Sequence, residues 1–166
     1  MSRKRQQGFT LVELLIAVAI AAIVLSMGVP SFRDALMNSR LTSQANAFVA
    51  AINLARSEAI KRSRNVTLEC NTGTDWTSGW KVWVDSNGNG TNDGGAEELR
   101  VEDAFDGTTT VSGGSKSSFQ YAPSGLLVGA SPNDTFSLCD SRSDETGRAI
   151  DVSVAGRVAV TRKVCL

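Results

Sequence analysis

Histidine is absent from this chain of 166 residues. Its absence removes the side chain that most often serves as general base and metal ligand, and it excludes Ser-His-Asp and Cys-His mechanisms within the chain. Among the residues that remain, no acid, base and nucleophile stand at a usable spacing. We therefore predict that the protein is not an enzyme and carries no cofactor.

Neither sign of charge is in excess, because the chain has 17 lysines and arginines and 17 aspartates and glutamates. Residues 1–8 include three basic side chains and no acidic one, so the rest of the chain carries 14 basic against 17 acidic residues. A mildly acidic protein of this kind is not a general nucleic-acid coat, although a local basic patch is still allowed.

Charged residues are almost missing from residues 9–29, where Glu13 is the one exception. A helix of about 21 residues is roughly 30 Å long and matches the thickness of a bilayer core. We predict that residues 9–29 form the transmembrane half of an N-terminal helix. The basic residues Arg3, Lys4 and Arg5 should stay in the cytoplasm, which places the rest of the chain outside the inner membrane.

Glu13 needs a positively charged partner, since an unpaired carboxylate in a membrane span costs on the order of 3 kcal/mol. Cleavage between Gly8 and Phe9 would create that partner as a new amino terminus. One helical turn separates this amine from Glu13, so the carboxylate can approach it or the amine of a neighbouring subunit. We predict that residues 1–8 are a leader peptide, that Gly8 and Phe9 form the processing site, and that Glu13 acts in assembly.

Helical periodicity continues beyond Pro30, which lacks a backbone donor and should kink the helix or loosen its preceding turn. Apolar residues recur at steps of three and four and therefore fall on one face. We predict an amphipathic half of the helix over residues 30–64, whose apolar stripe packs against the domain that follows. The stripe consists of Leu41, Ala45, Phe48, Ile52, Ala55 and Ala59.

Residues 65–166 change to short alternating segments separated by turns, which predicts a β-rich globular domain. Together with the helix, they indicate an α+β fold in which an antiparallel sheet wraps the distal half of the helix. The clearest signal is a hairpin at the end of the chain with its turn at 155–156. We expect strands at 66–70, 80–84, 98–102, 119–121, 126–128, 135–139, 149–154 and 157–161, and loops at 71–79, 85–95 and 107–116.

Three cysteines, Cys70, Cys139 and Cys165, lie in this domain. An oxidising compartment permits a disulfide, and the odd number leaves one thiol over. Cys139 and Cys165 could lie on adjacent strands, where a bridge would tie down the carboxyl terminus and contribute about 2–4 kcal/mol. We favour this pair, while pairing of Cys70 with either one stays open.

The loop at 85–95 opens with a pattern like the start of a calcium-binding loop, in which alternate side chains supply oxygen ligands. Its twelfth position is Ala96, where such a loop needs a bidentate glutamate, so any cation site here should be weak. An exposed connection between two strands accounts for the same residues. The candidate ligands are Asp85, Asn87, Asn89 and Asp93.

Basic residues gather at two places in the sequence. The basic residues in the segment 56–64 lie at the end of the helix, where positive charge interacts favourably with the negative end of the helix dipole. This interaction explains their presence without a bound ligand. Those on or beside the final hairpin could contact DNA phosphates, or they could form a solvated face paired with Asp140, Asp144 and Asp151. This second group is Arg148, Arg157, Arg162 and Lys163.

The start of the chain resembles the prepilin signature of type IV pilins and type II secretion pseudopilins. The matching features are the short basic leader, Gly8, Phe9 and the segment 10–15 with Glu13 in it. The resemblance implies cleavage after Gly8 by a prepilin peptidase, methylation of the Phe9 amine, and assembly with other pilins or pseudopilins. It also implies a precursor held in the lipid of the inner membrane.

The rest of the chain is similar to the FimT/FimU–GspH group of minor pilins and minor pseudopilins. The likeness implies a pilin-like fold and a subunit present in few copies near the filament tip, where it primes or caps assembly. The segments that carry it are 55–59, 79–85, 99–101, 119–125 and 156–158.

Some FimT-like members of this group are linked to DNA uptake through a Gly-Arg-x-Arg pattern. This chain departs from the pattern, because Ala159 stands where the second arginine would be. Our leading hypothesis is therefore a structural minor subunit of a type IV pilus or a type II secretion pseudopilus. A pilus-borne DNA receptor for natural transformation is the alternative.

Overall fold

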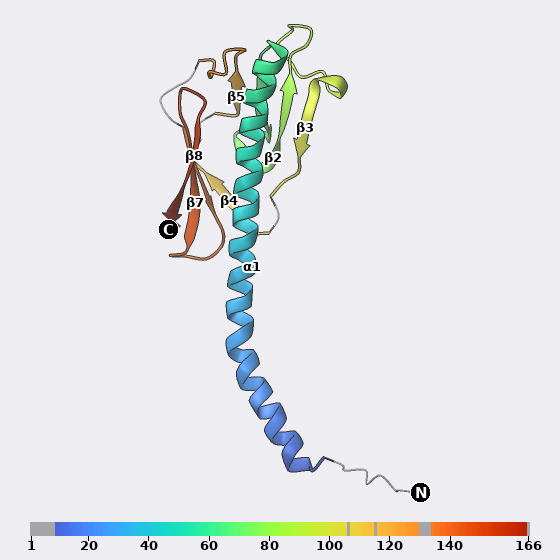
Figure 1. The fold of residues 1–166 in the computed structure, drawn as a ribbon, viewed down its shortest axis with the longest axis vertical. Coiled ribbons are helices and arrows are strands. Elements are labelled where there is room, and N and C mark those ends of the chain that lie inside the picture. Colours follow the sequence, from blue (N-terminus) through green and yellow to red (C-terminus); the bar gives the residue numbers. More distant parts are fainter. Residues whose placement is uncertain (1–8, 106, 115, 130–133, 166) are drawn as a thin grey trace, which may run out of the picture. The chain divides into compact units, whose positions relative to one another are not determined.

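The computed structural model describes residues 9–105, 107–114, 116–129 and 134–165 (Figure 1). A long helix precedes short antiparallel strands, which is the predicted α+β class, and the chain divides into the units Met1–Ser39 and Arg40–Leu166. The described elements are α1 (Leu11–Arg62), β1 (Val66–Thr72), β2 (Asp75–Val84), η1 (Gly95–Glu97), β3 (Glu98–Glu102), β4 (Thr110–Ser112), β5 (Ser118–Tyr121), β6 (Asp134–Cys139), β7 (Thr146–Val152) and β8 (Val158–Val164).

In the first unit, α1 exposes large apolar side chains along its length, from Leu11 to Leu36. Within the described ranges, α1 is the helix that is long and apolar enough to cross a membrane. Exposed apolar side chains suit contact with hydrocarbon, and the helix satisfies its backbone groups internally. Pro30 lies inside α1, and the helix continues through it.

In the second unit, α1 buries the predicted apolar stripe. Leu41, Phe48 and Ile52 are almost fully buried, and the alanines between them leave room for strands to pack closely. The prediction of this stripe is confirmed, and Ala51 is an additional buried member.

Two antiparallel sheets pack with this part of the helix, whereas one sheet was predicted. Their strand orders are β3-β2-β1-β5 and β4-β6-β7-β8. Figure 1 shows β3 and β8, the outer strands of the two sheets, on opposite flanks of α1. One core cluster joins the helix with strands of both sheets, since Phe48 lies with ring centroids 5.1 Å from Trp80 of the first sheet and 5.1 Å from Phe136 of the second.

Three of the expected loops and strands were wrong. The predicted loop at 71–79 contains the start of β2, and Trp76 is a buried strand residue whose indole N–H donates to the carbonyl of Lys116 at 2.9 Å. The predicted loop at 107–116 contains β4, which pairs with β6. The expected strand at 126–128 is reduced to a single bridge between Tyr121 and Leu127. The start of β2 and the whole of β4 were missed because they are rich in small polar residues and lack a clear alternation of apolar and polar side chains. These segments become strands because they pair with a neighbouring strand.

Candidate functional site

Thr10 and Glu13 cap the start of α1. The backbone N–H and the hydroxyl of Thr10 donate to Oε2 of Glu13 at 2.9 and 3.0 Å, and the N–H of Glu13 donates to the Thr10 hydroxyl at 3.2 Å. This reciprocal arrangement is a capping box, which satisfies backbone donors that the first helical turn leaves unpaired. The spacing Thr-x-x-Glu was readable in the sequence, but Thr10 was not singled out there.

The capping box holds the Glu13 carboxylate at the helix N-terminus, where the helix dipole favours negative charge. Thr10, which donates to this carboxylate, directly follows Phe9, whose side chain is exposed. Among the described residues, no hydrogen bond joins Glu13 to Phe9. Gly8, the other residue of the predicted processing site, lies outside the described residues.

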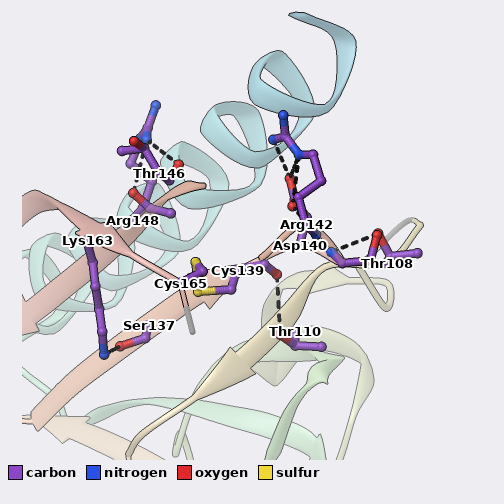
Figure 2. The surroundings of a disulfide bond; sticks show 12 residues. Thr108, Thr110, Ser137, Cys139, Asp140, Arg142, Thr146, Arg148, Lys163 and Cys165 are labelled. Carbon is purple, nitrogen blue, oxygen red and sulfur yellow. Dashed lines mark hydrogen bonds and ion pairs between the residues drawn. A yellow bond between two sulfur atoms is a disulfide. The ribbon is translucent and has the colours of Figure 1, made fainter. Parts of the chain in front are cut away.

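A disulfide at the other end of the chain joins Cys139 to Cys165, with their Cα atoms 5.8 Å apart (Figure 2). This is the pair that the sequence analysis favoured. The carbonyl and N–H of Cys165 are also tied to residues 144 and 145 by two backbone hydrogen bonds of 3.0 Å each. The carboxyl-terminal strand is therefore held covalently and by hydrogen bonds.

The predicted geometry of this disulfide was wrong, because the two cysteines are not on adjacent strands. Cys139 ends β6 and Cys165 follows β8, and β7 lies between those strands. The bridge passes over Gly147 of β7. A Cβ at that position would collide with Sγ of Cys165 and the carbonyl oxygen of Leu138, and it would approach Sγ of Cys139 to 3.1 Å. Glycine is thus required at 147 for space, and no pattern in the sequence indicated it.

Cys70 is the free cysteine, and it is buried in β1. Its thiol donates to the carbonyl of Gly73 at 2.9 Å. Burial raises the pKa of this thiol, because a thiolate would be poorly solvated there. The group behaves as a small core side chain with low reactivity.

Two of the four basic residues predicted to contact DNA are engaged in other contacts, as Figure 2 shows. The guanidinium of Arg148 donates to Oγ1 of Thr42 on α1 at 3.0 Å and to carbonyls of its own strand. The ammonium of Lys163 donates to the hydroxyl of Ser137 at 2.8 Å.

The four basic residues do not form one patch. Arg148 and Arg162 are register partners, which share a face of the sheet, and Lys163 points to the opposite face. Arg157 stands in the hairpin turn, about 17 Å along the strand from Arg162 at roughly 3.3 Å per residue. Asp140, one of the acids considered as their partner, forms an ion pair of 2.6 Å with Arg142, and a hydrogen bond from Arg142 lowers the pKa of Asp140.

The loop at 85–95 is organised by carboxylates that accept hydrogen bonds. Asp85 accepts from the backbone N–H groups of residues 88, 89 and 90 at 2.7–3.1 Å. Asp93 accepts from the side-chain amides of Asn87 and Asn89 at 2.6 and 2.8 Å. These contacts bring the four candidate metal ligands together as a hydrogen-bonded turn. Within the described ranges, no group of three or more His, Cys, Asp or Glu side chains is placed to hold a metal ion.

Glu97 closes this loop and was missed as a structural residue. It is 5% exposed, and its Oε1 accepts from the hydroxyl and N–H of Ser86 at 2.5 and 3.0 Å. Its Oε2 accepts from the N–H of Asp93 at 3.1 Å. These hydrogen bonds, led by the one from the Ser86 hydroxyl, lower the pKa of the Glu97 carboxyl group. The loop is therefore pinned to the start of β3.

The arrangement as a whole consists of an apolar helix with a capped acidic start, a disulfide-tied terminal strand, and a hydrogen-bonded loop. The family "Type II transport protein GspH" matches residues 44–156 of this chain, more than half of its length. The chain belongs to the GspH family. The prokaryotic N-terminal methylation motif matches residues 3–29, which include Phe9 and Glu13.

Individual relatives agree with this assignment. A fimbrial protein of Pseudomonas aeruginosa is 28% identical over 109 residues, which are 65% of this chain and 67% of the relative. Prepilin peptidase-dependent protein D of Escherichia coli (strain K12) is 38% identical over 45 residues, 27% of this chain and 31% of the relative.

Solved structures show the same likeness. A crystal structure of the type IV minor pilin FimU from Pseudomonas aeruginosa PAO1 superposes with a TM-score of 0.64 at 26% identity, covering 78% of this chain and 98% of that one. A second crystal form gives a TM-score of 0.61 at 26% identity, covering 75% and 99%.

This GspH-family chain is thus a FimU-like minor pilin or pseudopilin of a type IV pilus or a type II secretion system, with the N-methylation motif at its start. Its fold is the predicted pilin-like one, with a long N-terminal helix packed on antiparallel sheets. Members of the pilin family are structural proteins, so the prediction that the chain is not an enzyme is confirmed.

Proposed function

We propose that the chain is made as an inner-membrane precursor, is cut between Gly8 and Phe9 by a prepilin peptidase, and then primes or caps a filament. In this proposal residues 1–8 are removed, residues 9–29 anchor the precursor, and residues 65–166 face the periplasm. Support comes from the apolar exposed start of α1 and from the methylation motif at residues 3–29. The disulfide fits an oxidising compartment outside the membrane.

The observation that carries the proposal is the position of Glu13 in an apolar helix. The Glu13 carboxylate accepts a hydrogen bond from the backbone N–H of Thr10, the residue after Phe9. Cleavage before Phe9 would therefore create a new ammonium group on the residue next to the one that the carboxylate already contacts. In hydrocarbon the two opposite charges stabilise each other more strongly than in water. The amine of Phe9 in the same chain or in a neighbouring pilin subunit can fill this role.

Two roles of Glu13 must be separated, because the carboxylate also caps its own helix. Glutamine at the same position can still accept the Thr10 hydrogen bonds, since a capping box takes either glutamate or glutamine. Glu13→Gln therefore removes the charge and keeps the cap. Thr10→Ala is the matched variant, which removes the cap at a cost of about 1 kcal/mol in helix stability and keeps the charge.

The test is made in the native host with the full-length chain. Mass spectrometry should find the purified protein beginning at a methylated Phe9, and an intact residue 1 would contradict the proposal. Incorporation into sheared filaments should fall at least tenfold in Glu13→Gln and remain within about twofold of wild type in Thr10→Ala. Normal assembly of Glu13→Gln refutes charge pairing, and failure of Thr10→Ala alone assigns the role to the cap.

A further inference from the structure

The loop at 85–95 contains two Asn-Gly sequences, Asn87-Gly88 and Asn89-Gly90. All four residues are exposed, so water reaches them. Asparagine followed by glycine is chemically labile, because glycine has no side chain to hinder its backbone nitrogen. That nitrogen can attack the side-chain amide carbon of the asparagine before it. The loop therefore carries two sites at which the chain can modify itself.

The modification is deamidation, and water is its co-reactant. The backbone nitrogen of Gly88 forms a bond to Cγ of Asn87, and the bond from Cγ to Nδ2 breaks. Water carries the proton of the backbone nitrogen to the leaving group, which departs as ammonia. One water molecule then opens the cyclic succinimide to aspartate or isoaspartate. Asn89 and Gly90 allow the same steps.

The turn itself requires these labile residue types. Gly88 and Gly90 have φ angles of 80° and 78°, a left-handed conformation that other residues adopt only with strain. Oδ1 of Asn87 accepts from the N–H of Asn89 at 3.0 Å, and Oδ1 of Asn89 accepts from the N–H of Thr91 at 2.9 Å. Short amide side chains are suited to such bonds two residues ahead. The backbone path thus selects Asn-Gly twice, and replacing the glycines would strain it.

Asp85 holds the two attacking nitrogens. Its Oδ1 accepts from the N–H of Gly88 at 2.7 Å, and its Oδ2 accepts from the N–H of Gly90 at 2.9 Å. Each nitrogen must lose its proton to attack, and a carboxylate is too weak a base to take a backbone proton. Its negative charge instead disfavours the nitrogen anion that the attack requires. Both nucleophiles are therefore kept in an unreactive form.

Asp93 holds the two leaving groups. Its Oδ2 accepts from Nδ2 of Asn87 at 2.6 Å and from Nδ2 of Asn89 at 2.8 Å. Because Oδ1 of each asparagine is also bonded, neither amide can turn toward the next backbone nitrogen without breaking a hydrogen bond. Asp93 is itself anchored, since its N–H donates to Oε2 of Glu97 at 3.1 Å. Every atom that must move in the reaction is thus held by a partner.

We propose that Asn87 and Asn89 are latent deamidation sites, which the carboxylates of Asp85 and Asp93 keep unreacted in the folded protein. Each deamidation adds a carboxylate beside these two, and like charges at this distance repel. A first event therefore weakens the hydrogen bonds that protect the second asparagine. The inference concerns the second unit alone and is independent of the proposed cleavage before Phe9.

The test incubates the full-length chain in detergent at mildly alkaline pH and follows each asparagine by peptide mass spectrometry. Folded wild type should lose the amides of Asn87 and Asn89 about tenfold or more slowly than the same chain in guanidinium chloride. Asp85→Ala frees the attacking nitrogens, and Asp93→Ala frees the leaving groups. Each should raise the rate in the folded protein about tenfold, because hydrogen bonds to a charged group are lost. Tryptophan fluorescence shows whether each variant stays folded during the incubation.

Two controls assign the effect to this loop. Asp103→Ala removes an exposed carboxylate that follows β3, and its amides should be lost at the wild-type rate. Asp85→Ala/Asn87→Gln/Asn89→Gln should show no rapid loss, since the longer glutamine side chain forms a cyclic imide less readily.

Folded wild type that deamidates as fast as the denatured chain overturns the proposal, because the carboxylates then protect nothing. A wild-type rate in folded Asp85→Ala and Asp93→Ala overturns it as well. A slower rate in Asp85→Ala would show that this carboxylate assists the reaction, and the proposal would be wrong. If one variant unfolds, the other variant and the comparison of folded with denatured wild type decide the question.

Discussion

Gly147→Ala should prevent formation of the disulfide between Cys139 and Cys165, which crosses the sheet above residue 147. The added Cβ would collide with Sγ of Cys165 and with the Leu138 carbonyl, and the latter belongs to a paired backbone. Neither atom can move cheaply, because both are fixed in the ladder or in the bridge. We expect the variant to fold with the two cysteines reduced.

The magnitude follows from the loop that the disulfide closes. The cysteines are 26 residues apart, and loop-closure entropy for this separation corresponds to about 3.5 kcal/mol of folding stability. The contact with the Leu138 carbonyl adds about 1–3 kcal/mol, which is typical of overpacking. A domain of this size has about 5–15 kcal/mol in total, so the effect is a large fraction of it.

Urea unfolding of the full-length chain in detergent measures this loss. Tryptophan fluorescence reports on the second unit alone, since Trp76, Trp80 and Trp83 all lie on β2. Thiol titration of the denatured protein should give one free thiol in wild type, from Cys70, and three in Gly147→Ala.

A double-mutant cycle isolates the role of the bridge. Gly147→Ala in a Cys139→Ala/Cys165→Ala background should cost only the carbonyl contact, so the coupling between the sites should be about 3.5 kcal/mol. If Gly147→Ala retains one free thiol and the wild-type urea midpoint, the argument that glycine is required beneath the disulfide is wrong.

Two further predictions concern buried groups of the second unit. The folded-state pKa of Glu97 is lowered from 4.5, so this carboxylate stabilises the fold above that pH, and its contribution is lost as pH falls through the lower folded value. The urea midpoints of wild type and Glu97→Gln should therefore differ at pH 7 and converge at acid pH. A difference that does not change with pH would show that the pKa of Glu97 is not lowered in the folded protein. Cys70 should resist iodoacetamide in the folded protein and react fully in urea, and rapid labelling without urea would show that its thiol is not buried.

Glu13 shows how far local sequence reasoning reached. Its position in an uncharged run identified it as an assembly residue, and that role is still a proposal. The capping box is equally readable from the spacing Thr10-x-x-Glu13, in which the two side chains lie three positions apart. Local hydrogen bonds of this kind depend on neighbours in the chain, so the sequence contains all that is needed to predict them.

The strand at Trp76 shows where local reasoning failed. Thr, Ser and Gly residues around it predicted a loop, yet the indole is enclosed by Phe48, Phe119 and Phe136 at ring-centroid distances of 5.4–5.6 Å. Those residues come from three other elements of the chain. Tertiary burial therefore outweighed the turn propensity of the segment.

The four basic residues near the final hairpin illustrate the same division. Their nearness in sequence predicted a patch, and the register of β7 with β8 separates them onto two faces and a turn. Successive side chains on a strand point to opposite faces of the sheet. Basic residues that are close in the sequence of a strand therefore share a face only when an even number of positions separates them.

The sequence by itself determined the apolar helix, its buried stripe, the final hairpin and the class of the fold, because each depends on a periodicity within one segment. Only the tertiary structure decided that two sheets form, that the disulfide spans an intervening strand at Gly147, and that Glu97 pins the loop. These features depend on contacts between separate segments, which range from 11 residues apart for Ser86 and Glu97 to 88 residues apart for Phe48 and Phe136. The choice of these contacts is made by the packing of the whole core, which no single segment encodes.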